Sequence, residues 1–137
     1  CREKPMTLHT YRTAVLALAG LTALSIGTFI AVDPAGFYAG YAIPLQGNMD
    51  MLSELRASGA NLGVLGAVML LGTVLAPLRP YAVAAGLVVF TAFPTGRVLS
   101  LIADGWPSQK VLIALLVELV IAALCFTALV RTRRSDP

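Results

Sequence analysis

Charged residues are scarce in this sequence. They make up 12% of its 137 residues, about half the share that is usual for a soluble domain, while hydrophobic residues make up 58%. A chain with so few charges cannot surround its apolar side chains with a polar surface in water. This composition argues against a soluble all-helical domain.

Histidine and cysteine are also nearly absent, which argues against several kinds of site. The one histidine, His9, has no companion at a metal-ligand spacing and no serine beside it in an apolar stretch, so neither a zinc or haem site nor a catalytic triad is indicated. The two cysteines, Cys1 and Cys125, are too few for a disulfide framework, and Cys125 lies in an apolar stretch as a small apolar side chain. No glycine-rich loop follows a predicted strand, so no phosphate cradle is indicated. We expect no metal, no cofactor and no catalytic residue.

What the sequence does contain is four long apolar stretches. They cover residues 13–32, 57–76, 81–103 and 111–130. Each has about 20 residues, which as a helix span about 30 Å, the thickness of the hydrocarbon layer. The sequence therefore predicts one domain over residues 1–137, an all-α integral membrane bundle of four transmembrane helices.

The basic residues are distributed unevenly around these stretches, although the net charge is only +3. If the four spans alternate in direction, most cations fall on one side, namely Arg2, Lys4, Arg12, Arg79, Arg131, Arg133 and Arg134. The other side has Lys110, with Arg56 at its membrane edge. This positive-inside pattern predicts a multi-pass protein of the cytoplasmic (inner) membrane with both termini in the cytoplasm. The cations then contact lipid headgroups, and we expect no nucleic-acid partner.

The connecting segments give further expectations. Asp33-Pro34 ends the first helix, because proline disfavours helical geometry in the residue before it. The segment 33–52 contains Phe37, Tyr38 and Tyr41, and we interpret it as an aromatic belt at the outer interface rather than a ligand gate. Residues 77–80, Pro-Leu-Arg-Pro, form a tight turn that makes the second and third spans antiparallel neighbours.

Two features of the spans concern helix packing. The second stretch has a GxxxG motif at Gly59 and Gly63, followed by Gly66, and such small residues let two helices approach closely. The motif does not tell whether the partner helix belongs to the same chain. Pro94 in the third stretch predicts a kink, because it cannot donate to the carbonyl of Phe90. A nearby threonine hydroxyl or a neighbouring helix could satisfy that carbonyl.

Ionisable residues inside the spans are the candidates for a site. Arg97 is seven residues before Asp104 and Glu118 is eight residues after Lys110, so both lie about 10–12 Å inside the outer ends of their helices. A short turn joins these helices, so the two charges can meet. Pairing is expected because a lone charge at the bilayer centre costs about 2.5–3.5 kcal/mol, and an arginine can hold a carboxylate with two parallel bonds.

Other polar residues extend this pair into a polar seam. Asn61 falls near the same level, Glu54 lies on its face, and Ser100 continues the Arg97 face outward. The candidate ligand-binding or polar-core residues are Arg97, Glu118, Asn61, Arg56, Glu54, Ser100 and Asp104. Three interpretations of the charged residues remain open: a structural clamp that sets the register of two helices, a ligand or proton site, and an Arg97 that reaches to the outer headgroups.

One stretch also resembles a known family. It reads Ala92-Phe-Pro-Thr-Gly-Arg97-Val-Leu-Ser100-Leu-Ile-Ala-Asp104-Gly105-Trp-Pro107-Ser108, with Glu118-Leu119 further on and Leu55-Arg56-Ala57 upstream. This pattern resembles a bacterial family of small four-helix membrane proteins of unknown function, DUF4345, over most of the chain. The resemblance implies a four-span fold in the cytoplasmic membrane. It makes Arg56, Arg97, Ser100, Asp104 and Glu118 family-pattern residues without an assigned role.

These observations lead to two hypotheses about function. The first is a non-enzymatic accessory or assembly subunit of a membrane complex, because the chain has little mass outside its spans, glycine-rich helix faces and no catalytic set. Its partners would be membrane lipids and other membrane-protein subunits. The alternative is a lipid or small-molecule binding or transport protein, or an isomerase-like enzyme, that uses a polar site at Arg97 and Glu118.

Overall fold

A computed structural model of the protein describes residues 8–45 and 47–133; Cys1 lies outside this part. The described chain is mostly helical and contains no strand. Its elements are α1 (Leu8–Val32), α2 (Pro34–Ala39), α3 (Met49–Val74), the 3₁₀ turn η1 (Ala76–Leu78), α4 (Arg79–Ala103) and α5 (Gln109–Arg133). The four longer helices are each long and apolar enough to cross a membrane. The predicted all-α fold with four spanning helices is thus confirmed.

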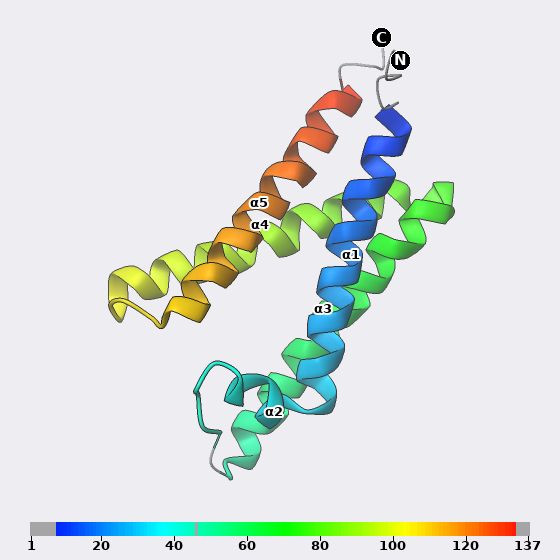
Figure 1. Cartoon of the computed structure of the whole chain (residues 1–137). Coiled ribbons are helices and arrows are strands. Elements are labelled where there is room, and N and C mark those ends of the chain that lie inside the picture. The colour runs from blue at the N-terminus through cyan, green and yellow to red at the C-terminus, as the bar shows by residue number, and fades with distance from the viewer. Residues whose placement is uncertain (1–7, 46, 134–137) are drawn as a thin grey trace, which may run out of the picture.

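The four long helices form two antiparallel hairpins (Figure 1). In one hairpin α1 lies beside α3, and in the other α4 lies beside α5. The start of α1 and the end of α5 meet at one end of the molecule, where the hydroxyls of Tyr11 and Thr127 are 2.7 Å apart. The opposite end, called the α2 end below, carries α2 and the turn at residues 104–108. Toward this end the two hairpins diverge (Figure 1).

Glycines set the close approach of α1 and α3. A Cβ atom placed on Gly66 would lie 2.4 Å from the backbone nitrogen of Leu24, and one on Gly27 would lie 2.3 Å from that of Gly63. Neither contact is possible for a real side chain. At Gly63 itself a Cβ atom would meet nothing closer than 3.7 Å. The GxxxG motif therefore packs against α1 of the same chain, and Gly66 needs to be glycine more than Gly63 does.

The third helix joins the bundle through a tight turn. The sequence at residues 77–80 forms η1 and the start of α4, and α4 then runs back along α3, with a Cβ atom on Gly72 meeting that of Ala82. Pro94 is buried inside α4 without ending it. The hydroxyls of Thr91 and Thr95 donate to the carbonyls of Leu87 and Thr91, so neither of them satisfies Phe90 as the sequence suggested.

The distribution of apolar side chains is that of a membrane protein. The buried residues of the described chain are apolar, and no polar or charged residue is fully buried there. Large apolar side chains also cover the outside: Ile102 is 78% exposed and Leu116 is 63% exposed. Such a surface is unfavourable in water but suits contact with acyl chains. Cys125 is buried in the core, in agreement with its expected role as an apolar side chain.

The segment after α1 folds into a compact cap at the α2 end. Asp33 follows the last residue of α1 and accepts a hydrogen bond from the backbone nitrogen of Gly36 at 2.9 Å, which caps the short helix α2. The ring of Phe37 lies 5.2 Å from that of Tyr38 and 5.4 Å from that of Tyr41, measured between centroids. This aromatic cluster fixes the two tyrosines near the opening between the hairpins.

Candidate functional site

The site is centred on an ion pair between the helices of the second hairpin. Nε of Arg97 donates to both carboxylate oxygens of Glu118, at 2.9 and 3.1 Å, and Nη2 donates to Oε1 at 3.0 Å. The two charges meet because α4 and α5 are joined by a short turn that places the residues at equal depth. The side chains are 29% and 15% exposed, so a ligand can reach the pair.

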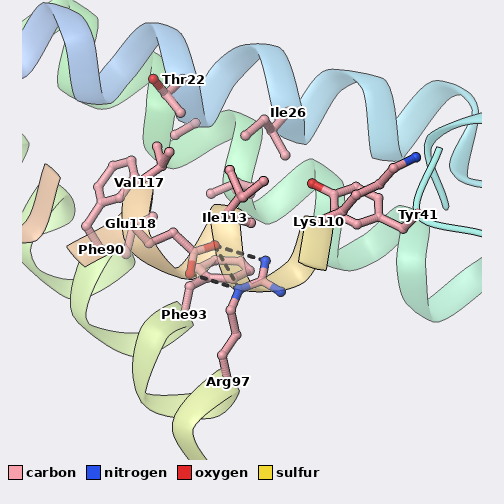
Figure 2. A pocket seen from close by; sticks show the side chains of 14 residues that line it. Thr22, Ile26, Tyr41, Phe90, Phe93, Arg97, Lys110, Ile113, Val117 and Glu118 are labelled. Atoms are coloured by element: carbon pink, nitrogen blue, oxygen red, sulfur yellow. Dashed lines mark hydrogen bonds and ion pairs between the residues drawn. The ribbon is translucent and has the colours of Figure 1, made fainter. Parts of the chain in front are cut away.

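A pocket of about 290 Å³ lies between the two hairpins and contains this pair in its wall (Figure 2). Each of the four long helices contributes to the pocket. The apolar lining includes Ile26 of α1, Leu62 of α3, Phe90 and Phe93 of α4, and Ile113 and Val117 of α5. The walls are therefore mostly apolar, and the ion pair is the main polar feature at mid-length.

The pocket has a polar end and an apolar end. Figure 2 shows Tyr41 and Lys110 together at one end and Phe90 with Val117 at the other. Nζ of Lys110 donates to the carbonyl oxygen of Gly40 at 2.5 Å, which ties the start of α5 to the segment after α2. The polar end is thus held in place by contacts between parts of the chain that are 70 residues apart.

Helical periodicity explains why these residues share one pocket. On α5, Lys110, Ala114 and Glu118 are spaced by four residues, and on α4, Phe90 and Phe93 precede Arg97 by seven and four. Residues at such spacings lie on one face of a helix. The face of α4 toward the pocket is therefore apolar up to Arg97, and the face of α5 carries Lys110 and Glu118.

A second groove of about 510 Å³ adjoins the pocket, and Phe93 and Arg97 line both. Its other lining residues include Tyr38 of α2 and Ser100 of α4. Burial raises the pKa of the Tyr38 hydroxyl above its ordinary value, and the positive charge of Arg97 lowers it in part. Arg97 therefore lines both the pocket and the groove, and its charge affects Tyr38 in the groove.

Residues 12–129 match the family described as a domain of unknown function, DUF4345. The chain belongs to the DUF4345 family. No curated protein and no solved structure matches it. The DUF4345 match extends from α1 to α5 and includes every residue that lines the pocket. The family assigns no activity, so the function of this DUF4345 protein has to be argued from its site.

The structure brings only some of the predicted site residues to the ion pair. Ser100 lines the adjoining groove with Arg97, and its hydroxyl donates to Oδ2 of Asp104 at 2.8 Å. Arg56 is used elsewhere: its Nη1 donates to the carbonyl oxygens of Ala31 and Val32 at 2.6 and 2.7 Å. These are the last carbonyls of α1, which have no partner within their own helix.

Of the seven candidate residues of this DUF4345 protein, only Arg97 and Glu118 line the pocket. Glu54 and Asn61 are exposed on α3, whereas Leu62, the neighbour of Asn61, lines the pocket. One step along a helix turns the side chain by 100°, which directs Asn61 away from the second hairpin. The expected seam through Asn61 is therefore not continuous with the ion pair.

Two ionisable residues of the pocket, Lys110 and Tyr41, are not among the candidates from the sequence. Lys110 was interpreted only as a topology signal, and Tyr41 only as part of an aromatic belt. The four-residue spacing from Lys110 through Ala114 to Glu118 could have identified the lysine. No comparable signal exists for Tyr41, because its position depends on how the segment after α2 folds. Within residues 8–45 and 47–133 no group of three or more histidine, cysteine or acidic residues is placed to hold a metal ion.

Proposed function

We propose that this protein binds a lipid or another amphiphilic small molecule in the pocket between its two hairpins. The observation that carries the proposal is a mostly apolar pocket into which a few polar groups converge. Such a combination is typical of small-molecule sites, and helical bundles often form them between helices. The apolar end takes the hydrophobic part of the ligand, and Arg97, Lys110 and Tyr41 contact its polar part.

The size of the pocket limits the ligand. Its volume of about 290 Å³ is close to the lower end of the range of about 300–1,000 Å³ for small-molecule sites. One acyl chain or a compact ring system suits this volume better than two chains. A two-chain lipid would leave one chain in the surrounding bilayer.

The pocket is also accessible from the membrane. Among its lining side chains, Ile26 is 37%, Val117 is 49% and Ile113 is 54% exposed. These side chains lie on spanning helices, so the exposed parts face acyl chains rather than water. A ligand that is dissolved in the bilayer can therefore reach the pocket sideways. With both termini in the cytoplasm, as the basic residues suggest, the polar end faces the outer side of the cytoplasmic membrane.

A second candidate function, an accessory subunit of a membrane complex, is favoured by one observation on α3. Ser58 and Asn61 are exposed on this helix, and Asn61 lies twelve residues, or about 18 Å, from its start at Met49. An amide that faces hydrocarbon lacks hydrogen-bond partners, and transmembrane helices often satisfy such groups through each other. A partner helix on this face would satisfy Asn61.

The test is to purify the protein in a mild detergent and to identify bound molecules by native mass spectrometry and lipid extraction. Ala114 lines the pocket, and Ala114→Phe fills part of it. Ala123 is on the same helix and is exposed to lipid, so Ala123→Phe is the matched control. We expect a bound amphiphile in the wild type and the control but not in Ala114→Phe. A stable protein partner without any bound amphiphile would favour the accessory subunit instead.

A further inference from the structure

The guanidinium of Arg97 has donors that the ion pair does not use. Glu118 accepts from Nε and Nη2 only, and no hydrogen bond of Nη1 is formed within the described chain. In Figure 2 no dashed line reaches the remaining terminal nitrogen, which lies on the side away from the carboxylate. An arginine has five N–H donors, so Nη1 can donate twice to a further acceptor. The carboxylate fixes the guanidinium in place without saturating it.

Lys110 adds a second positive charge at the polar end. Its ammonium group has three donors, of which one is given to the carbonyl of Gly40. With Arg97 and Lys110 against the single carboxylate of Glu118, the charged groups that line the pocket leave one net positive charge. An anion complements this charge, and a site of low polarity strengthens the attraction.

The apolar end extends deeper along the same helices. Val89 lines the pocket eight residues before Arg97 on α4, which is a distance of about 12 Å along the helix axis. Lys110 precedes Glu118 by the same number of residues on α5, on the other side of the ion pair. The cations therefore lie at one end and at the middle of a narrow space whose remaining end is apolar.

We propose that the ligand is a single-chain amphiphile with an anionic head, a carboxylate or a phosphate. This rests on the proposed function and specifies its ligand. The head accepts hydrogen bonds from Nη1 of Arg97, the positive charge of Lys110 at the polar end of the pocket attracts the same head, and the chain points toward Phe90. Glu118 is a positioning residue that holds the guanidinium in the orientation this contact requires. The same chemistry is offered by a fatty acid and by a lysophospholipid, whereas free phosphate offers only the head.

The experiment measures equilibrium binding of four probes to the purified full chain in a neutral detergent. The probes are palmitate, lysophosphatidate, the uncharged analogue hexadecanol, and inorganic phosphate. We expect the two anionic amphiphiles to bind, hexadecanol to bind about ten-fold more weakly, and phosphate not to bind alone, because a hydrogen bond to a charged group contributes more than a neutral one. Which of the two anionic amphiphiles binds more tightly identifies the source of the head.

The variants separate the head group from the chain. Lys110→Gln should weaken palmitate binding about ten-fold and leave hexadecanol binding unchanged, and Lys110→Arg should restore palmitate binding. Arg79 is a cation at the opposite end of the molecule, so Arg79→Gln is the control and should change neither. Thermal unfolding and gel filtration of each variant test whether it is folded.

The possible failures are distinguishable. If palmitate and hexadecanol bind equally and Lys110→Gln has no effect, the proposal of an anionic head is wrong, while the proposal of an amphiphile-binding pocket still stands. If phosphate alone binds as tightly as palmitate, the proposal that the ligand has an acyl chain is wrong. If no amphiphile binds and Ala114→Phe changes nothing, both this inference and the proposed function are overturned.

Discussion

Nη1 of Arg56 lies 2.7 Å from the carbonyl oxygen of Val32, the last residue of α1. The same nitrogen also donates to the carbonyl of Ala31. The end of one helix is thus capped by a cation of its neighbour, where carbonyl groups without a partner carry partial negative charge. This contact ties the first part of α3 to the end of α1, where the segment that contains α2 begins.

Loss of this contact should reduce stability without removing the pocket. We expect Arg56→Gln to lower the free energy of unfolding by about 1 kcal/mol, because two charge-assisted hydrogen bonds are lost at an exposed position. Glu54→Gln, two residues away on the same helix, should have little effect. Thermal unfolding in detergent measures both variants, and an unchanged midpoint for Arg56→Gln would mean that water replaces the contact at no cost.

The glycines of α3 give a second prediction, which compares two changes of equal size. Gly66→Ala forces α1 away, since its Cβ would lie 2.4 Å from the backbone of Leu24, whereas Gly63→Ala has room, with its nearest neighbour at 3.7 Å. Overpacking of this kind costs about 1–3 kcal/mol. Gly66→Ala should therefore unfold at a clearly lower temperature than Gly63→Ala. Equal midpoints would show that α1 and α3 are less tightly packed than the structure indicates.

The sequence was sufficient to predict the spans and the meeting of Arg97 with Glu118. Both follow from counting residues along helices, because 1.5 Å per residue and a short turn fix the depth of each side chain. The end of α1 before Pro34 was predictable for a similarly local reason. These inferences need no knowledge of how the hairpins are rotated relative to each other.

The sequence was not sufficient for features that depend on that rotation. The GxxxG motif does not identify the helix that packs against it, and only the packed structure shows that Gly59 and Gly66 face α1. Asn61 was placed at the right depth but on the wrong side of its helix for a seam with Arg97. Arg56 has a partner on the backbone of another helix, and backbone carbonyls leave no pattern in a sequence. The pocket also contains Lys110 and Tyr41. Counting residues from the helix ends gives the depth of a side chain but not the direction in which it points, so it could not identify these two residues.

The third prediction concerns pH. The pKa of Tyr38 is raised by burial above its ordinary value of 10.0, with Arg97 opposing the shift. Below this value Tyr38 is protonated in both the folded and unfolded states and does not affect the pH dependence of stability. Above it the unfolded chain loses the proton first, so the free energy of unfolding falls as the pH rises through the folded pKa.

Tyr38→Phe should remove this part of the alkaline loss of stability, which thermal unfolding at several alkaline pH values can measure. Arg97→Gln should raise the pKa of Tyr38 further, because the favourable charge is gone; the absorbance of tyrosinate, compared with and without Tyr38→Phe, follows this change. If Arg97→Gln leaves the titration of Tyr38 unchanged, the two side chains do not approach each other across the groove.

The last prediction separates a structural clamp from a binding site at Arg97 and Glu118. Glu118→Leu leaves an arginine without its partner inside a span, and we expect it to destabilise the fold by about 2.5–3.5 kcal/mol. The double variant Arg97→Leu/Glu118→Leu removes both charges and should regain most of this stability, because replacing an ion pair with apolar residues is often neutral.

Ligand binding decides the matter, since a clamp and a site predict different behaviour of the double variant. If the pair only sets the register of α4 and α5, the stable double variant retains any amphiphile that the wild type binds. If Arg97 holds the head of a ligand, the double variant is folded but binds palmitate at least ten-fold more weakly, while hexadecanol still enters the apolar end. Because stability is regained in both cases, lost binding in this variant cannot be attributed to unfolding, and it identifies the guanidinium as a ligand contact.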